Sequence, residues 1–210
     1  MHWCIATVTT LNPNLRRNRL ILFIIALICF VPFAIAWYLA KNPQLVEGRQ
    51  KSNYGHLISP AQPFEYTDFF RNPITPAETL PEIKGRWVML QVASGPTCND
   101  PCQKTAHKTG QLRLMLNKEI PRVRRLLLLP GQADPSALKA LTAADPTLLI
   151  AGLSETLRQR LQETVGAPLV DGMMLLMDPF ANVMMWYEPG FDPYGALRDL
   201  QRLLKISQIG

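Results

Sequence analysis

The sequence has few of the residues that common catalytic centres require. Histidine occurs only three times. Residues 41–210 offer no Ser–His–Asp set and no HExxH motif, and no glycine-rich phosphate loop follows an expected strand. These absences argue against serine hydrolases, zinc proteases and P-loop nucleotide hydrolases.

Charge is also scarce, since charged residues make up 18% of the chain and hydrophobic residues 48%. That balance supports a packed core rather than disorder. The net charge of +6 includes three arginines ahead of an apolar run and a small cluster at Arg122, Arg124 and Arg125. Because no basic patch interleaved with aromatic residues is present, we expect no nucleic acid partner. The 210 residues suit one domain plus an N-terminal targeting segment.

Residues 20–40 form an uncharged apolar run that predicts a transmembrane helix. As a helix this run is about 31 Å long, enough to cross the hydrocarbon core. Pro32 is its only helix breaker, and membrane helices tolerate proline. Arg16, Arg17 and Arg19 precede the run, whereas only Lys41 follows closely. The positive-inside rule therefore predicts a single-pass protein of the bacterial inner membrane, with a cytoplasmic N-terminus and a periplasmic C-terminal domain.

A cleaved signal peptide is the alternative, because Ala-Ile-Ala at 34–36 resembles a cleavage site after a basic region. The apolar run continues beyond it through Trp37, Tyr38 and Leu39. That length favours an uncleaved anchor. Either alternative exports the domain that follows.

The sequence divides into four segments: a cytoplasmic tail at 1–19, the transmembrane helix at 20–40, a tether and N-terminal arm at 41–85, and a folded domain at 86–210. In the domain, short apolar strands alternate with amphipathic helices, and a β-hairpin and a last helix follow. This order predicts an α/β, thioredoxin-like fold with a mostly parallel sheet covered on both faces. The strands are expected at 87–93, 125–129, 147–151, 173–177 and 183–187.

Helix starts are signalled by residues that cap N-termini, at Asp134, Ser154 and Asp192. For the first helix of the domain we expect Asp100 as the cap, Pro101 as the first helical residue and Gln103 in a capping box. Its core stripe is expected at Leu112, Met115 and Leu116, with Pro121 at its end.

Cys98 and Cys102 form a Cys-x-x-x-Cys motif between the first strand and this helix. We expect Cys98 in the loop as the more exposed thiol. Cys102 falls in the first helical turn, where the helix dipole stabilises a thiolate. Such a pair can exchange disulfides or bind Cu(I), and it can equally be a structural disulfide. Cys4, on the cytoplasmic side, and Cys29, in the membrane, cannot pair with it.

The motif and its setting resemble the Sco/SenC family, membrane-tethered thioredoxin-like proteins that serve copper delivery to cytochrome c oxidase. The likeness extends over about residues 50–205. It comprises the N-terminal anchor, an Asn-Tyr-Gly stretch at 53–55, the two cysteines, and Leu-Met-Asp-Pro at 176–179. The resemblance implies a role in oxidase assembly, with Cu(I) as a candidate ligand of Cys98 and Cys102. The implied partners are oxidase subunit II, through its copper-site cysteines, or other oxidase assembly factors.

The chain departs from that family at the third copper ligand, a His in an Asp-His-Ser segment before the last hairpin. Residues 168–173 read Pro-Leu-Val-Asp-Gly-Met and contain no His. His2 is expected in the cytoplasm, His56 in the arm, and His107 on the helix, turned away from Cys102. Pro168 is a candidate cis-proline opposite the cysteines. Methionines 173, 174, 177, 184 and 185 are soft potential ligands, but their places in apolar strands favour a core role.

Three functional hypotheses follow. In the first, the protein is a thiol–disulfide oxidoreductase for oxidase assembly, in which Cys98 attacks a partner disulfide and Cys102 resolves the mixed disulfide, or the two exchange roles. In the second, it is a Cu(I) chaperone that uses both cysteines. In the third, it is a non-catalytic membrane interaction module of the same fold.

Overall fold

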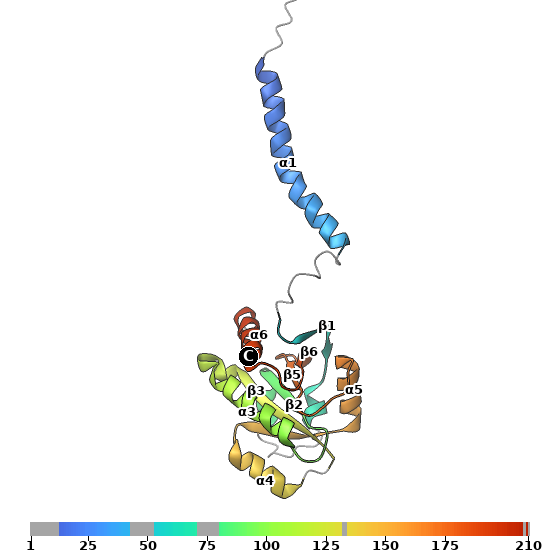
Figure 1. The fold of residues 1–210 in the computed structure, drawn as a ribbon, viewed down its shortest axis with the longest axis vertical. Coiled ribbons are helices and arrows are strands. Elements are labelled where there is room, and N and C mark those ends of the chain that lie inside the picture. Colours follow the sequence, from blue (N-terminus) through green and yellow to red (C-terminus); the bar gives the residue numbers. More distant parts are fainter. Residues whose placement is uncertain (1–12, 43–52, 71–79, 132–133, 208, 210) are drawn as a thin grey trace, which may run out of the picture. The chain divides into compact units, whose positions relative to one another are not determined.

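The computed structural model describes residues 13–42, 53–70, 80–131, 134–207 and 209. They belong to two separate units, which divide between Lys51 and Ser52 (Figure 1). The first unit contains one helix, α1 (Pro13–Lys41). The second unit is an α/β domain with a single six-stranded sheet.

Helix α1 contains the predicted apolar run and begins before it. Within its 27-residue segment Leu15–Lys41, an 18-residue stretch has a mean hydropathy of 2.9, and none of that stretch is buried. By length and composition, this helix is a candidate transmembrane span. Pro32 lies inside the helix without interrupting it.

The sheet has the strand order β1-β6-β5-β2-β3-β4. The central strand β2 pairs in parallel with β3, which pairs in parallel with β4, and β2 pairs antiparallel with β5 on its other side. Strand β6 pairs antiparallel with both β5 and β1. The strands are β1 (His56–Pro63), β2 (Trp87–Val92), β3 (Val123–Pro130), β4 (Leu148–Leu153), β5 (Met174–Met177) and β6 (Asn182–Tyr187).

The sheet has the expected parallel strands β2, β3 and β4 and the expected antiparallel hairpin of β5 and β6, but three of its five pairings are antiparallel, so it is not mostly parallel. The strand that was not expected is β1, which lies in the segment assigned to the tether and arm. It adds an edge strand beside β6, with an irregular register between Leu57 and Gln62. Because its side chains are mostly exposed, it shows no apolar alternation that would reveal a strand.

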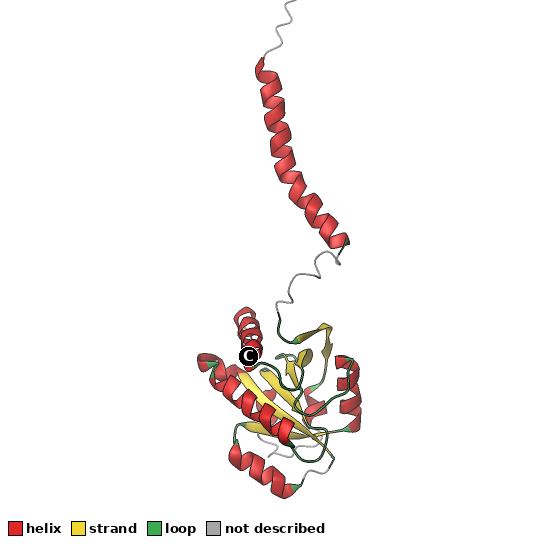
Figure 2. Cartoon of the chain, viewed as in Figure 1, coloured by secondary structure: helices red, strands yellow, loops and turns green. Residues whose placement is uncertain are grey.

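Helices cover both faces of the sheet, as expected (Figure 2). Leucines of α5 (Glu155–Val165) and Phe69 of the short α2 (Tyr66–Phe70) pack on one face. Leucines of α3 (Asp100–Leu114) and α6 (Pro193–Ile206) pack on the other, beside α4 (Pro135–Ala144). Two 3-10 segments, η2 (Leu80–Ile83) and η3 (Asn117–Arg122), precede β2 and β3.

Three of the predicted caps are present. Asp134, Ser154 and Asp192 each accept a hydrogen bond from a backbone N–H in the first turn of their helix.

The C-terminal end of α3 differs from the prediction, because the helix stops at Leu114 and Met115 is 38% exposed. Pro121 lies inside η3 instead of ending α3, since the chain has already left the α-helical path.

The chain that begins the domain is fastened to α6. Asp199 is 3% exposed, and its Oδ2 accepts hydrogen bonds from the N–H groups of Tyr54 (2.8 Å) and Gly55 (2.9 Å). The same oxygen accepts a third bond from the hydroxyl of Tyr187 on β6, at 3.1 Å. One buried carboxylate thus joins the start of the domain, its last strand and its last helix.

Candidate disulfide site

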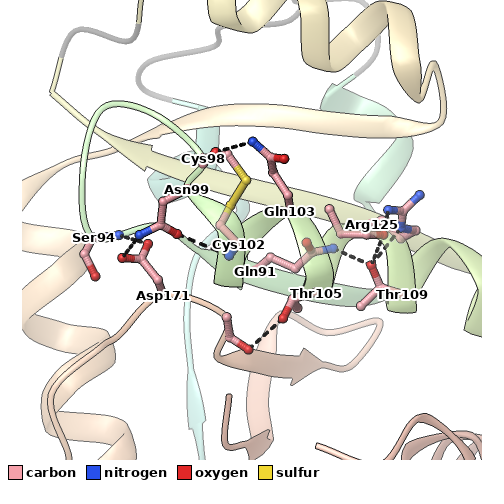
Figure 3. Close-up of a disulfide and its surroundings, with 12 residues drawn as sticks. Gln91, Ser94, Cys98, Asn99, Cys102, Gln103, Thr105, Thr109, Arg125 and Asp171 are labelled. Carbon is pink, nitrogen blue, oxygen red and sulfur yellow. Dashed lines mark hydrogen bonds between the residues drawn. A yellow bond between two sulfur atoms is a disulfide. The ribbon is translucent and has the colours of Figure 1, made fainter. Parts of the chain in front are cut away.

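Cys98 and Cys102 form a disulfide between the loop after β2 and the first turn of α3 (Figure 3). Their Cα atoms are 5.2 Å apart. Both residues are buried, with 6% of Cys98 and 2% of Cys102 exposed. Cys98 is the more exposed of the two, as expected, but the difference is small because the pair packs into an apolar cluster with Leu127, Leu129 and Ile150. Cys29 is a free, exposed residue of α1, and Cys4 lies outside the described residues.

The residue that caps α3 is Asn99, not Asp100. Its side-chain oxygen accepts the Cys102 N–H at 3.3 Å, and Asp100 is the first helical residue. Gln103 does not close a capping box, since its amide donates to the Cys98 carbonyl at 2.9 Å. Cys102 is the third helical residue, so the prediction that it lies in the first turn is confirmed. That position is close to the positive end of the helix dipole.

Asp171 joins the two ends of the loop that carries Cys98, residues 94–99. It accepts the backbone N–H of Ser94 and the side-chain amide of Asn99, each at 2.8 Å. Figure 3 shows its carboxylate between these two groups. Sequence reasoning missed this role, because Asp171 is distant in sequence. Its only signal was its place in the segment where the Sco/SenC family carries Asp-His-Ser.

Gly172, the residue after Asp171, packs against α3. Its φ of +83° lies in the left-handed region, and a Cβ there would lie 3.1 Å from the Pro101 carbonyl oxygen. Its own carbonyl accepts the Thr105 hydroxyl at 3.0 Å. The backbone of this turn therefore packs directly on the first turn of α3 and leaves little room for a side chain.

A buried polar network lies beneath α3. Arg125 of β3 is 1% exposed and donates to the Ala106 carbonyl, to the Thr109 hydroxyl and to Asp145. Gln91 of β2 donates to the same Thr109 hydroxyl at 2.6 Å (Figure 3). Burial raises the pKa of Asp145, but hydrogen bonds from Arg125 and from the neighbouring threonine outweigh it, so that this pKa lies below its usual value.

The histidines do not join the cysteines. His107 lies on α3 and is exposed. His56 stacks on Trp186, with ring centroids 4.2 Å apart, and its Nε2 lies 3.4 Å from a Glu188 oxygen. His2 is outside the described residues. Pro168 is not a cis-proline, because Ser59–Pro60 is the only cis peptide bond in the described parts of the chain.

The methionines lie in the core, in line with the favoured interpretation. Four are almost fully buried, namely Met173, Met174, Met177 and Met185. Met184 on β6 is partly buried and packs against the cluster that contains Met174 and Met185. Within the ranges that the structure describes, no group of three or more His, Cys, Asp or Glu side chains is arranged to hold a metal ion.

A strand, a loop that carries Cys98, and a helix with Cys102 in its first turn are the arrangement of a thioredoxin-like domain, and here the two cysteines form a disulfide. The chain belongs to the family described as transmembrane-like, thioredoxin-like, C-terminal domain, whose model matches residues 87–207, more than half of the chain. No curated protein sequence matches this chain.

Solved structures of similar fold include apo Sco1 from Thermus thermophilus, at 18% sequence identity and a TM-score of 0.55. That match covers 75% of this chain and all of the other. Copper-bound ScoI from Bradyrhizobium japonicum also matches, at 18% identity and a TM-score of 0.44, covering 58% of this chain and 87% of the other. At 18% identity, the likeness to the Thermus thermophilus structure shows a shared fold and no more.

Proposed function

We propose that this protein is a divergent, Sco-like, membrane-anchored oxidoreductase that assists assembly of the copper site of cytochrome c oxidase by thiol–disulfide exchange. The observation that carries the proposal is the Cys98–Cys102 disulfide at the junction between β2 and the N-terminus of α3. Thioredoxin-like redox proteins use the same junction. The choice of the oxidase as the partner rests on the resemblance to the Sco/SenC family.

In the reduced protein, the Cys98 thiolate attacks one sulfur of a partner disulfide. A mixed disulfide forms, and the other partner sulfur leaves as a thiolate. Cys102 then attacks the Cys98 sulfur, which restores the intramolecular disulfide and releases the second partner thiolate. The partner disulfide gains two electrons and the cysteine pair loses two, which an external reducing dithiol must resupply. The positive end of α3 favours the thiolate form of Cys102 for the second step.

Burial sets a condition on this chemistry. Because both cysteines are nearly fully buried, we expect a partner to reach the sulfurs only after the 94–99 loop, which carries Cys98, moves. Residues of that loop before Cys98 are largely exposed, and its two ends are joined through Asp171. Local opening of the loop, rather than unfolding of the domain, is therefore the expected route to exchange.

Glutathione titration of the purified full chain tests the exchange. The cysteine pair is expected to titrate as a two-electron couple, and Cys102→Ser is expected to hold a mixed disulfide at Cys98. Cys29→Ser is the matched control and leaves both results unchanged. A pair that stays oxidised until the domain unfolds would identify a structural disulfide and refute the exchange.

The assignment to the oxidase needs a separate experiment in cells. Replacement of both Cys98 and Cys102 by Ser is expected to lower the copper content of oxidase subunit II, while Cys29→Ser leaves it unchanged. If the double variant assembles normal oxidase, the oxidase is not the partner and a non-catalytic module is favoured. The result of the glutathione titration would still hold.

Copper binding is the second candidate, favoured by two sulfur ligands whose Cα atoms are 5.2 Å apart. Reduced Cys98 and Cys102 suit Cu(I), which prefers soft donors. The groups that contact this loop, Asp171 and Asn99, offer oxygen and amide donors, and Gly172 supplies no side chain. The residues present therefore fit a two-sulfur cargo site and do not fit the family's three-ligand site. Anaerobic Cu(I) titration is expected to show one ion bound per reduced pair, and Cys98→Ala to abolish it.

The location is also part of the proposal. We place residues 1–19 in the cytoplasm and the domain in the periplasm, because Arg16, Arg17 and Arg19 flank one end of the apolar run and only Lys41 flanks the other. In intact cells whose outer membrane is permeabilised, a membrane-impermeant thiol reagent is expected to label Gln201→Cys and not Cys4. The opposite labelling would reverse the topology.

A further inference from the structure

Helix α6 has two very different faces. Its leucines Leu197, Leu200 and Leu204 are buried against the sheet. The residues exposed along the opposite side are aromatic, basic, amide or aliphatic, and its acidic residue, Asp199, is buried. Tyr194, Arg198, Gln201, Arg202 and Lys205 recur on this side at three- and four-residue spacing and form what we term the α6 face.

The start of the domain lies against this face. Arg198 donates to the Tyr54 hydroxyl at 2.6 Å, and its guanidinium lies 5.4 Å from the centre of the Tyr54 ring. Gly195 allows the contact, because a Cβ there would lie 2.5 Å from Cδ1 of Tyr54. With the two backbone bonds to Asp199, these contacts fix where the chain from the anchor joins the domain.

That junction is close to the anchor along the chain. Asn42, just after α1, is only eleven residues from Asn53. Covalent geometry limits such a span to about 40 Å at full extension. The α6 face, which begins at the junction, is therefore held at high local concentration near the membrane that α1 would cross.

We propose that the α6 face, together with Tyr54, binds the anionic lipid headgroups of the anchoring membrane. Arg198, Arg202 and Lys205 provide the cationic groups that attract phosphate, as juxtamembrane basic clusters do. Tyr54 and Tyr194, each more than half exposed, provide amphipathic rings of the kind that favour the membrane–water interface. The chain connection favours a lipid surface over a protein partner, because eleven residues limit the distance between Asn53 and the end of α1 to about 40 Å whether or not a partner is present. The inference depends on anchoring by α1 and not on the exchange chemistry.

Energy transfer in nanodiscs tests the proposal with the full chain. The protein carries Gln201→Cys with a neutral donor dye, in a Cys4→Ser, Cys29→Ser background, and the acceptor is on a lipid headgroup. Transfer is expected to be at least twofold higher in discs of phosphatidylcholine with 30% phosphatidylglycerol than in phosphatidylcholine alone. The difference is expected to disappear in 0.5 M NaCl, because exposed charges are screened at that ionic strength.

Two triple variants separate this face from overall charge. Replacing Arg198, Arg202 and Lys205 by Gln is expected to reduce transfer in anionic discs to the neutral-disc level. The control replaces three exposed lysines on other elements by Gln, namely Lys104, Lys118 and Lys139, and is expected to keep the difference. Unchanged circular dichroism shows that both variants fold. Equal energy transfer in the two kinds of disc, or an equal loss of transfer in both triple variants, overturns the proposal. Equal transfer in the two kinds of disc would favour a protein partner for the α6 face.

Discussion

The carboxylate of Asp199 carries a prediction that can be worked out from its contacts. In the Asp199→Asn variant the side chain keeps its shape, and its amide oxygen can still accept hydrogen bonds from the N–H groups of Tyr54 and Gly55 and from Tyr187. What it loses is the charge. Hydrogen bonds to a charged group contribute about 1.5–3 kcal/mol each, and neutral ones about 1 kcal/mol. The difference is about 0.5–2 kcal/mol per bond, so for three bonds to one buried oxygen we expect the free energy of unfolding to fall by about 1.5–6 kcal/mol.

Urea unfolding of the full chain in detergent, followed by tryptophan fluorescence, measures this change. Tyr187→Phe is the matched control, because it removes one of the three donors to the carboxylate and is expected to cost about 1.5–3 kcal/mol. Hydrogen exchange adds a local measurement, since the amides of Tyr54 and Gly55 should exchange faster in Asp199→Asn than in Tyr187→Phe. A loss below about 0.5 kcal/mol for Asp199→Asn would show that the charge does not stabilise this junction, and would refute the reasoning.

Three further predictions concern the site and its surroundings. Asp145→Asn should lower the free energy of unfolding by about 2 kcal/mol at pH 7, because it removes the negative charge that pairs with buried Arg125. The folded pKa of Asp145 lies below its unfolded value of 3.8, so the wild type should lose this stabilisation as the pH falls below about 4, while the variant should show no such loss in acid titration. Gly172→Ala should destabilise the domain more than Gly190→Ala, each measured by urea unfolding. Both glycines have φ above +80°, but a Cβ at Gly190 meets no atom within 4 Å, so equal losses would disprove the contact at Gly172. Asp171→Ala should accelerate reduction of the disulfide by dithiothreitol about 30-fold, if two lost hydrogen bonds release about 2 kcal/mol of loop closure; an unchanged rate would mean that the loop does not control access.

Local signals predicted most of the domain correctly. The caps Asp134, Ser154 and Asp192 each stand alone before an amphipathic segment, so the first turn has one good acceptor to use. At α3, Asn99 and Asp100 are adjacent and both suit a cap. Asn99 is the cap, and its side-chain amide also donates a hydrogen bond to Asp171, which is distant in sequence. Sequence spacing contains no information on such a contact.

The cysteine site was predictable in part for the same reason. The spacing of Cys98 and Cys102, and their place before a capped helix, are local properties and were visible in the sequence. Their burial depends on the apolar cluster under α4 and on the turn at Gly172, which other segments supply. The antiparallel edge was missed because β1 is recognised as a strand only through its pairing with β6.

The outermost strand has a consequence for crowding in the membrane. Pro60 and Pro63 lie within β1 and carry no N–H, so this border of the sheet is short of donors for a neighbouring chain. Anchored proteins are confined to two dimensions and collide often. A border that contains two prolines therefore disfavours strand pairing between neighbouring copies.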